Sequence, residues 1–212
     1  MKKMFMIAIL PFIMWACGEK KAENQDSKVA VDTTKVQECT YELIKDSARV
    51  AWTAFKFTER VGVNGKFDTF MIAGNTSAKT TDEILKSLSM KVLVSSVNTG
   101  NPDRDAKIKK EFFGTMASKD TLSGFVKEVG TDSLTISFKM NNIEKDIKAA
   151  YKISETEISL ISMIDVGMWN ASKSIAALNK VCKDVHKGAD GKSILHPDVK
   201  LSISAAINKI CK

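Results

Sequence analysis

Three segments of this chain alternate apolar and polar side chains with a period of two residues, and this pattern restricts the possible folds most. The clearest is 133–140, SLTISFKM, in which every second residue is apolar. Segments 147–154 and 199–207 repeat the pattern. Because successive side chains of a strand point to opposite faces, each segment predicts a strand with one apolar face.

Other short apolar stretches are separated by turn residues and extend this pattern to about eight strands. We expect these further strands at 41–44, 49–58, 66–73, 90–94, 122–129 and 158–164. Many short strands with one apolar face each predict an all-β barrel or sandwich. Closing the sheet would remove its exposed edges, and an eight-stranded barrel is either filled by side chains or holds one small ligand.

Three helices are expected among these strands, one of them within the segment 90–113. Thr81-Asp82-Glu83 resembles a helix start, and the apolar residues that follow share one face up to residue 88. Near the C-terminus, Asn170 is expected to cap a longer amphipathic helix that runs to about His186 and stops at Gly188.

The segment 90–113 joins a strand, a turn and a short helix. Asn101 is expected to act as the N-cap and Pro102 to take the first helical position. Asp103 and Asp105 fall in the first turn, where carboxylates are favoured by the helix dipole. The segment ends on two aromatic residues, Phe112 and Phe113.

The first residues resemble a targeting segment. Lys2 and Lys3 precede an apolar run, and Ala16-Cys17 is similar to a bacterial lipobox, although Met14 and Trp15 depart from it. We expect residues 1–16 to be a lipoprotein signal peptide, with Cys17 as the lipid attachment site; an ordinary signal peptide is the alternative. Residues 17–38 are polar and aperiodic, which predicts a disordered tether before a domain at 39–212.

Three cysteines remain, in a compartment that permits disulfides. They allow three pairings with one free thiol. Cys39 precedes the first strand and Cys211 ends the last, and these points come close in a closed sheet of even strand number, which favours Cys39–Cys211. Cys182 shares a helix face with apolar residues, including Val185, and is expected to fill the core.

Other function classes find little support in the sequence. The net charge is +7, but no Arg/Lys block interleaved with aromatic residues indicates nucleic-acid binding. No Gly-x-Ser-x-Gly, phosphate loop or His-Glu-x-x-His is present, so we expect no enzyme and no catalytic residues. The possible metal ligands do not follow a compact spacing, so no metal site is expected; they are His186, His196, Asp184, Asp190 and Asp198.

Three parts of the chain together resemble the YceI-like family: Trp52–Phe57, the turn and strand GVNGKF at 62–67, and SVNTGNPDRDAKIKKEFF at 96–113. Lys107 stands where the family commonly has histidine, and Asp165-Val166-Gly167 matches a family motif without its phenylalanine. The helix and loop expected at 170–196 look like an addition that some members of the family have. The residues that fall on the central pattern are Thr99, Gly100, Asn101, Arg104, Asp105, Ile108, Phe112 and Phe113.

The resemblance implies a lipocalin-like, eight-stranded antiparallel barrel with an apolar lumen that binds a polyisoprenoid chain or a similar amphiphile, such as a quinone-like lipid. No other cofactor is implied. Arg104 is expected either to contact a head-group phosphate or to pair with Asp105 and pin the loop. The expected lumen lining is Trp52, Phe67, Phe70, Val92, Val94, Phe112, Phe113, Phe125, Ile136 and Phe138.

Three functions therefore follow as hypotheses. The first is a non-enzymatic carrier or store of an apolar lipid, anchored by its acyl group in the bacterial envelope. We expect the outer membrane, facing the periplasm or the cell surface. The second is an accessory enzyme acting on isoprenoid or quinone lipids, and the third is a structural lipoprotein with a filled barrel.

Overall fold

The computed structural model describes residues 37–212. The expected signal peptide, Cys17 and nearly all of the expected tether lie outside the described residues. The described strands are β1 (Cys39–Lys56), β2 (Val61–Phe67), β3 (Phe70–Ala73), β4 (Ser77–Ala78), β5 (Ser89–Leu93), β6 (Val97–Asn98), β7 (Thr121–Val129), β8 (Ser133–Met140), β9 (Ile143–Ile153), β10 (Glu157–Asp165) and β11 (Leu195–Cys211).

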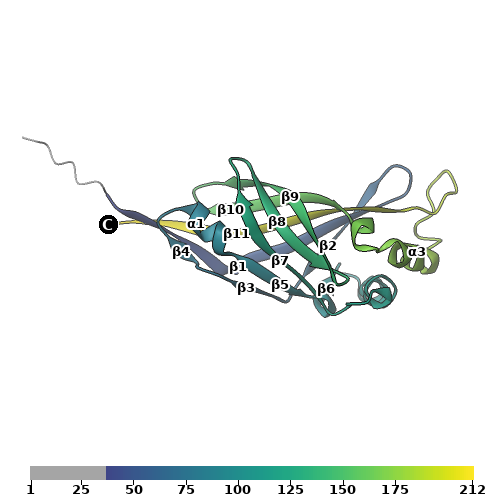
Figure 1. Ribbon diagram of the computed structural model, residues 1–212. Coiled ribbons are helices and arrows are strands. Elements are labelled where there is room, and N and C mark those ends of the chain that lie inside the picture. The colour runs from purple at the N-terminus through teal and green to yellow at the C-terminus, as the bar shows by residue number, and fades with distance from the viewer. Residues whose placement is uncertain (1–36) are drawn as a thin grey trace, which may run out of the picture. The chain divides into compact units, whose positions relative to one another are not determined.

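These strands form one curled antiparallel sheet around an apolar interior (Figure 1), so the all-β prediction is confirmed. The order is β3-β5-β7-β8-β9-β10-β11-β1-β2-β6, and β4 pairs with β1. Neighbours along the chain pair from β7 to β11, as expected for strands joined by short turns.

The prediction of eight strands is wrong, since the path holds ten. The expected strand at 66–73 is divided, because residues 68 and 69 separate β2 from β3. A further strand, β6, follows the expected strand at 90–94 after the 3-10 helix η1 (Val94–Ser96). The Asp68 amide donates to the Ser96 carbonyl and the Leu93 amide donates to the Thr69 carbonyl, at 3.1 and 3.0 Å. These two bonds link the divided strands across the irregular stretch.

The break expected between the strands 41–44 and 49–58 is also absent, because β1 runs without interruption from Cys39 to Lys56. The step from Ile44 to Arg49 on β1 faces only the step from Ser204 to Ala206 on β11, so the extra residues form a wide bulge. Ser47 Oγ donates to the Ile44 carbonyl and accepts from the Ala206 amide, at 2.6 and 2.7 Å. The Ser47 hydroxyl thus provides hydrogen bonds for the backbone groups of Ile44 and Ala206 at the bulge, and the strand continues without a turn.

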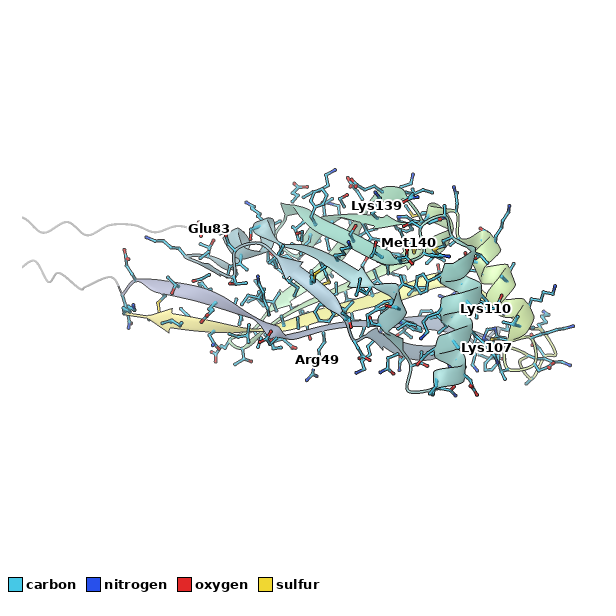
Figure 2. The ribbon with its side chains drawn as sticks, turned by 90° about the horizontal axis from the view of Figure 1, so that it is seen from below. Arg49, Glu83, Lys107, Lys110, Lys139 and Met140 are labelled. Atoms are coloured by element: carbon cyan, nitrogen blue, oxygen red, sulfur yellow. A yellow bond between two sulfur atoms is a disulfide. The ribbon has the colours of Figure 1, made fainter. Side chains whose placement is uncertain are left out.

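Helical elements cover the two ends of the sheet. The helix α1 (Thr81–Ser87) lies at one end, while α2 (Pro102–Lys107), the π-helix η2 (Ile108–Phe112), the 3-10 helices η3 (Phe113–Thr115) and η4 (Val166–Trp169), and α3 (Ser172–Val181) lie toward the other (Figure 1). Figure 2 shows this separation, with Glu83 near one end and Lys107 and Lys110 near the other.

Of the three expected caps, the one at Asn101 is confirmed, the cap of α1 is Thr80, one residue before the expected Thr81, and the one at Asn170 is wrong. Asn101 caps α2, its side chain accepting from the Arg104 amide at 3.0 Å, and Thr80 and Glu83 form a capping box on α1. Asn170 does not cap α3. It ends η4 in the left-handed conformation, with φ 58°, and α3 begins after Ala171 and stops at Val181, well before His186.

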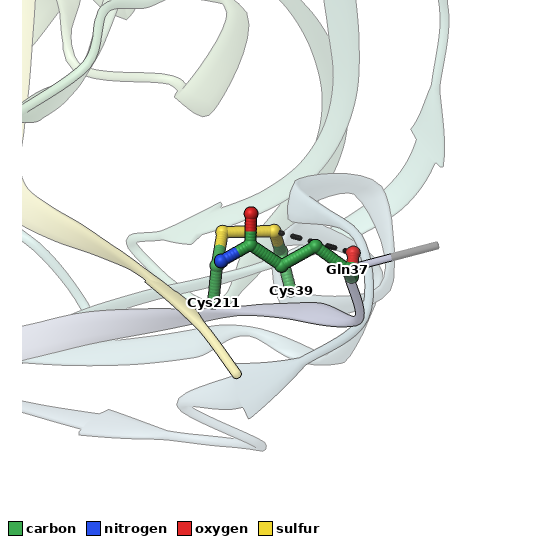
Figure 3. The surroundings of a disulfide bond; sticks show 3 residues. All are labelled: Gln37, Cys39 and Cys211. Carbon is green, nitrogen blue, oxygen red and sulfur yellow. Dashed lines mark hydrogen bonds between the residues drawn. A yellow bond between two sulfur atoms is a disulfide. The ribbon is translucent and has the colours of Figure 1, made fainter. Parts of the chain in front are cut away.

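The ends of the chain's domain are tied by a disulfide between Cys39 and Cys211, the first residue of β1 and the last of β11 (Figure 3). Their Cα atoms are 4.0 Å apart, and the Gln37 carbonyl oxygen lies 3.7 Å from Cys39 Sγ. Cys182 is free and buried.

Candidate functional site: two adjoining apolar cavities

The interior of the sheet holds two cavities. The first, called cavity 1, has a volume of about 150 Å³ and lies toward α1. Its wall is built from apolar side chains and a few serines. Leu85 of α1 is buried and, with Leu88, closes this end. Apolar strand faces thus enclose a space that water does not favour.

The second space, called cavity 2, has a volume of about 130 Å³ and lies toward α2 and α3. Strand residues such as Trp52 and Val199 form part of its wall. Ile108, Phe112 and Phe113 reach it from the helical segment after β6. The α3 segment adds the side chains Ile175, Leu178 and Cys182, and cavity 2 is also lined by Arg104, His186 and His196.

Four residues line both cavities: Phe67, Leu122, Phe138 and Leu201. The two spaces are therefore neighbours inside one curled sheet, separated by these side chains. Phe138 is held from behind by Trp169, which is fully buried; their ring centroids are 5.3 Å apart, and Trp169 Nε1 donates to the Phe138 carbonyl at 3.2 Å.

The helical cover of cavity 2 is held by a buried carboxylate. Asp105 is buried, and one of its oxygens accepts from the Thr99 amide at 2.9 Å and from Thr99 Oγ1 at 2.6 Å. Thr115 Oγ1 donates to Ser174 Oγ at 2.7 Å and joins η3 to α3. Asp105 therefore pins the Thr99 turn, as one of the two sequence interpretations proposed.

Arg104 does not form the ion pair with Asp105 that this interpretation also expected. None of the ion pairs formed within residues 37–212 includes Arg104, so the expected pairing with Asp105 is absent there. Its backbone amide is used by the Asn101 cap, while the side chain is exposed and contributes to the rim of cavity 2.

His186 is a buried histidine that the sequence offered only as a metal ligand. Its Nδ1 lies 2.8 Å from Asn179 Oδ1. Burial, with Lys56 and Lys107 nearby, lowers the pKa of His186 from its ordinary value of 6.5 to about 4. The imidazole is therefore neutral at physiological pH.

His196 is held in a different way. Its Nε2 donates to the Phe57 carbonyl at 2.7 Å, and its Nδ1 lies 3.2 Å from Arg60 Nη1. Arg60 also pairs with Asp198 at 2.9 Å. His196 thus ties the β1–β2 turn to β11.

The structure does not join the possible metal ligands. Among residues 37–212, no group of three or more His, Cys, Asp or Glu side chains is placed to hold a metal ion. No helix within that range has both the length and the apolar character needed to cross a membrane.

Most of the expected lumen residues lie at the cavities. Val92 and Ile136 line cavity 1, Trp52, Phe112 and Phe113 line cavity 2, and Phe67 and Phe138 line both. Whether these side chains contact a ligand stays a prediction.

Three other expected residues are placed differently. Phe70 and Val94 pack in the core without lining either cavity. Phe125 touches cavity 1 but also a shallow outer groove, and it is 45% exposed because it lies on the opposite strand face from Leu122.

Sequence reasoning missed the contribution of α3 to the cavity wall. The apolar face that includes Ile175, Leu178 and Cys182 could have indicated it. Val185 was expected on the same face but is 59% exposed, because the helix ends at Val181.

A model of the YceI-like domain matches residues 41–205. The chain belongs to the YceI-like family. The match covers the strands that enclose both cavities, and it includes the segment 170–196. No curated protein sequence matches the chain.

Solved structures show the same fold at low sequence identity. A polyisoprenoid binding domain from Saccharophagus degradans, implicated in plant cell wall breakdown, is 16% identical with a TM-score of 0.56, covering 79% of this chain and 97% of its own. BcnA from Burkholderia cenocepacia is 12% identical with a TM-score of 0.52, covering 78% and 99%. A Campylobacter jejuni YceI protein is 15% identical with a TM-score of 0.50, covering 74% and 89%.

Proposed function

We propose that this YceI-like protein binds one isoprenoid or other long apolar chain in cavities 1 and 2 and carries or stores it. The observation that carries the proposal is the position of the two cavities, which adjoin inside one sheet and share Phe67, Leu122, Phe138 and Leu201 as a common wall. A chain threaded past these side chains would occupy both spaces.

The chemistry of the lining favours a hydrocarbon. Burial of apolar surface contributes about 25 cal/mol per Å², and each buried methylene about 0.8 kcal/mol. Cavity 1 offers a methylene chain little besides apolar side chains and serines, and one of these, Ser162, already donates to the Lys148 carbonyl at 2.7 Å. A polar ligand would find few partners there.

The family supports this class of ligand. The Saccharophagus degradans structure is described as a polyisoprenoid binding domain and shares the fold over most of both chains. Within the proposal, binding is the whole activity, and the cavity residues contact the chain without reacting with it.

The carrier would work from a membrane surface. Cys17, as the lipid-modified first residue, would anchor it, because two or more acyl chains hold a protein stably on a bilayer. A flexible tether up to residue 38 would span about 25 Å and hold the domain just off the surface. We propose the outer membrane, facing the periplasm or the cell surface.

The test is native mass spectrometry of the full mature protein purified from its envelope, followed by organic extraction. A co-purified apolar lipid, together with acyl groups on Cys17, is the expected result. An empty mass and no uptake of added prenyl or quinone lipids would indicate a structural lipoprotein. Chemical conversion of the bound lipid on incubation would instead indicate an enzyme.

A further inference from the structure

We propose that the apolar chain enters and leaves cavity 1 sideways, through a slot in the wall between β1 and β3. The slot is the stretch where residues 44–49 of β1 face residues 68–75 without strand pairing. This inference rests on the proposed function and adds to it the route by which the ligand reaches its cavity.

Both ends of the slot are fixed by backbone pairing, but the length between them is not. At one end Val50 pairs with Phe67. At the other end the Leu43 amide donates to the Thr76 carbonyl at 2.7 Å. Between these points, within the described chain, β3 pairs with β5 alone, and β1 has no strand partner on this side. The wall here therefore lacks the row of hydrogen bonds that joins neighbouring strands.

The backbone on each edge of the slot bonds away from the other edge. On the β3 side, the Asn75 amide donates to Ser87 Oγ at 2.9 Å, next to the end of α1. On the β1 side, residues 45–48 pair with neither β2 nor β11, and the Ser47 hydroxyl holds the bulge to β11. Parting two paired strands would break a whole row of hydrogen bonds, whereas moving the bulge away from β3 would break few.

Cavity 1 reaches the slot from the inside. Its wall includes Ala48 and Val50 from β1 and Ile72 from β3, so both edges of the slot belong to the cavity. These side chains are apolar, and Ala48 and Ile72 are only partly buried. Arg49, which lies between Ala48 and Val50 in the chain, is exposed and points outward (Figure 2). A hydrocarbon in the slot would therefore contact apolar side chains on both edges.

The other boundaries of cavity 1 are closed more firmly. At the α1 end, Leu85 is fully buried and the helix is held by its capping box. From cavity 2, the chain would have to pass Phe67 and Leu122, which are buried in the shared wall. The strands from β5 to β11 are each paired on both sides. The slot is thus the part of the wall that opens with the smallest loss of hydrogen bonds.

The test measures rates of ligand transfer with the full mature protein, freed of lipid. The probe is all-trans-retinol, an isoprenoid alcohol whose fluorescence reports binding. Its release into phosphatidylcholine vesicles gives the dissociation rate constant, and mixing it with the empty protein gives the association rate constant. Circular dichroism checks the folding of each variant.

The first variants add a ring in three places. Ala48→Phe places it at the slot, and we expect both rate constants to fall by about fivefold or more because the ring obstructs the route. Ala149→Phe places it on β9 inside cavity 1 and should instead speed release, because it weakens binding. Ala150→Phe, exposed on the other face of β9, is the control and should match the wild type.

A second pair of variants removes atoms and does not depend on how Ala48→Phe folds. Ile72→Ala widens the slot and should raise the association rate constant by about twofold or more. Ile136→Ala removes the same atoms from the wall of cavity 1 between paired strands. It should lower affinity through faster release, with no gain in association rate.

Unchanged or faster release from folded Ala48→Phe would overturn the slot as the route and leave the proposed function standing. Equal association rates of Ile72→Ala and Ile136→Ala would do the same, and this comparison decides alone if Ala48→Phe does not fold. Failure of the wild type to bind retinol and geranylgeraniol alike would overturn both the slot and the proposed function.

Discussion

Cavity 1 and cavity 2 adjoin in one sheet but differ in how they are lined. Cavity 1 is enclosed by strand faces and the short helix α1. The side-chain hydroxyls in its wall belong to a few serines. Cavity 2 adds the connections after β6 and β10, which bring Arg104, Cys182 and His186 to its wall. Alternating strands supply a uniform apolar surface, whereas the connections at one end supply groups that can distinguish ligands.

This difference gives the lumen a direction. A methylene chain gains similar free energy in either cavity, whereas the charged and imidazole side chains that reach a cavity wall, those of Arg104, His186 and His196, are found at cavity 2. The predictions below test whether the cavity 1 end and the cavity 2 end of the lumen contribute independently to stability and to ligand binding.

The largest expected effect lies outside both cavities. Replacing both Cys39 and Cys211 by serine should lower the free energy of unfolding by about 2–5 kcal/mol, because the unfolded chain is no longer closed into a large loop. Urea denaturation measures the loss. Ligand affinity of the folded variant should equal that of the wild type, and a fall in affinity would show that the disulfide acts on the cavities.

Asp105→Ala should destabilise the cover of cavity 2 by about 2–3 kcal/mol, because the Thr99 amide and hydroxyl lose a buried charged acceptor. Asp103→Ala is the matched control, since Asp103 is an exposed carboxylate on the same helix. Thermal unfolding of the two variants gives the comparison. Equal losses would contradict the role assigned to Asp105.

His186 should make stability depend on pH. Its pKa in the folded protein is about 4, below the ordinary 6.5, so between these values the unfolded chain binds a proton that the folded chain does not. Stability contributed by the neutral ring is present above pH 6.5 and falls by about 1–3 kcal/mol as the pH drops to 4. His186→Gln should flatten this part of the stability curve; an unchanged slope would assign it to other groups.

The smallest effect is expected at the far end of cavity 1. Thr80→Ala removes the side-chain cap of α1 and should cost about 1 kcal/mol. Lys86→Ala, an exposed change on the same helix, is the control. Hydrogen exchange of the α1 amides should rise in Thr80→Ala and stay near the wild type in the control. Faster exchange around cavity 2 as well would show that the two ends are coupled.

The sequence predicted the parts of the fold that depend on period and local chemistry. Alternation in 133–140 gave the strand β8, and Asn101 with Pro102 gave the start of α2. The strand count failed at Ser47 and at 94–96, where hydroxyls and a 3-10 turn satisfy the backbone in ways that periodicity does not record.

The candidate site was predictable from the sequence to a similar extent as the fold. Phe112 and Phe113 could be placed in the lumen because they end a motif with fixed spacing. Phe125 touches cavity 1 but is also exposed on the outer face, because Leu122, three residues away, faces the other side of the strand. The partners of His186, Asn179 and Ser193, are separated from it by a helix end and a loop whose path only the folded chain defines.

The central claim is that one chain occupies both cavities, and a filled cavity 1 tests it most directly. Ala149 is 2% exposed and lines cavity 1, whereas Ala150 is exposed on the other face of β9. Affinities for farnesol and for the longer geranylgeraniol would be measured on Ala149→Phe and Ala150→Phe, with circular dichroism to check folding. We predict that Ala149→Phe lowers geranylgeraniol affinity by about tenfold or more, as expected for losing a few buried methylenes, and that Ala150→Phe matches the wild type. Wild-type affinity for the long chain in folded Ala149→Phe would contradict the account.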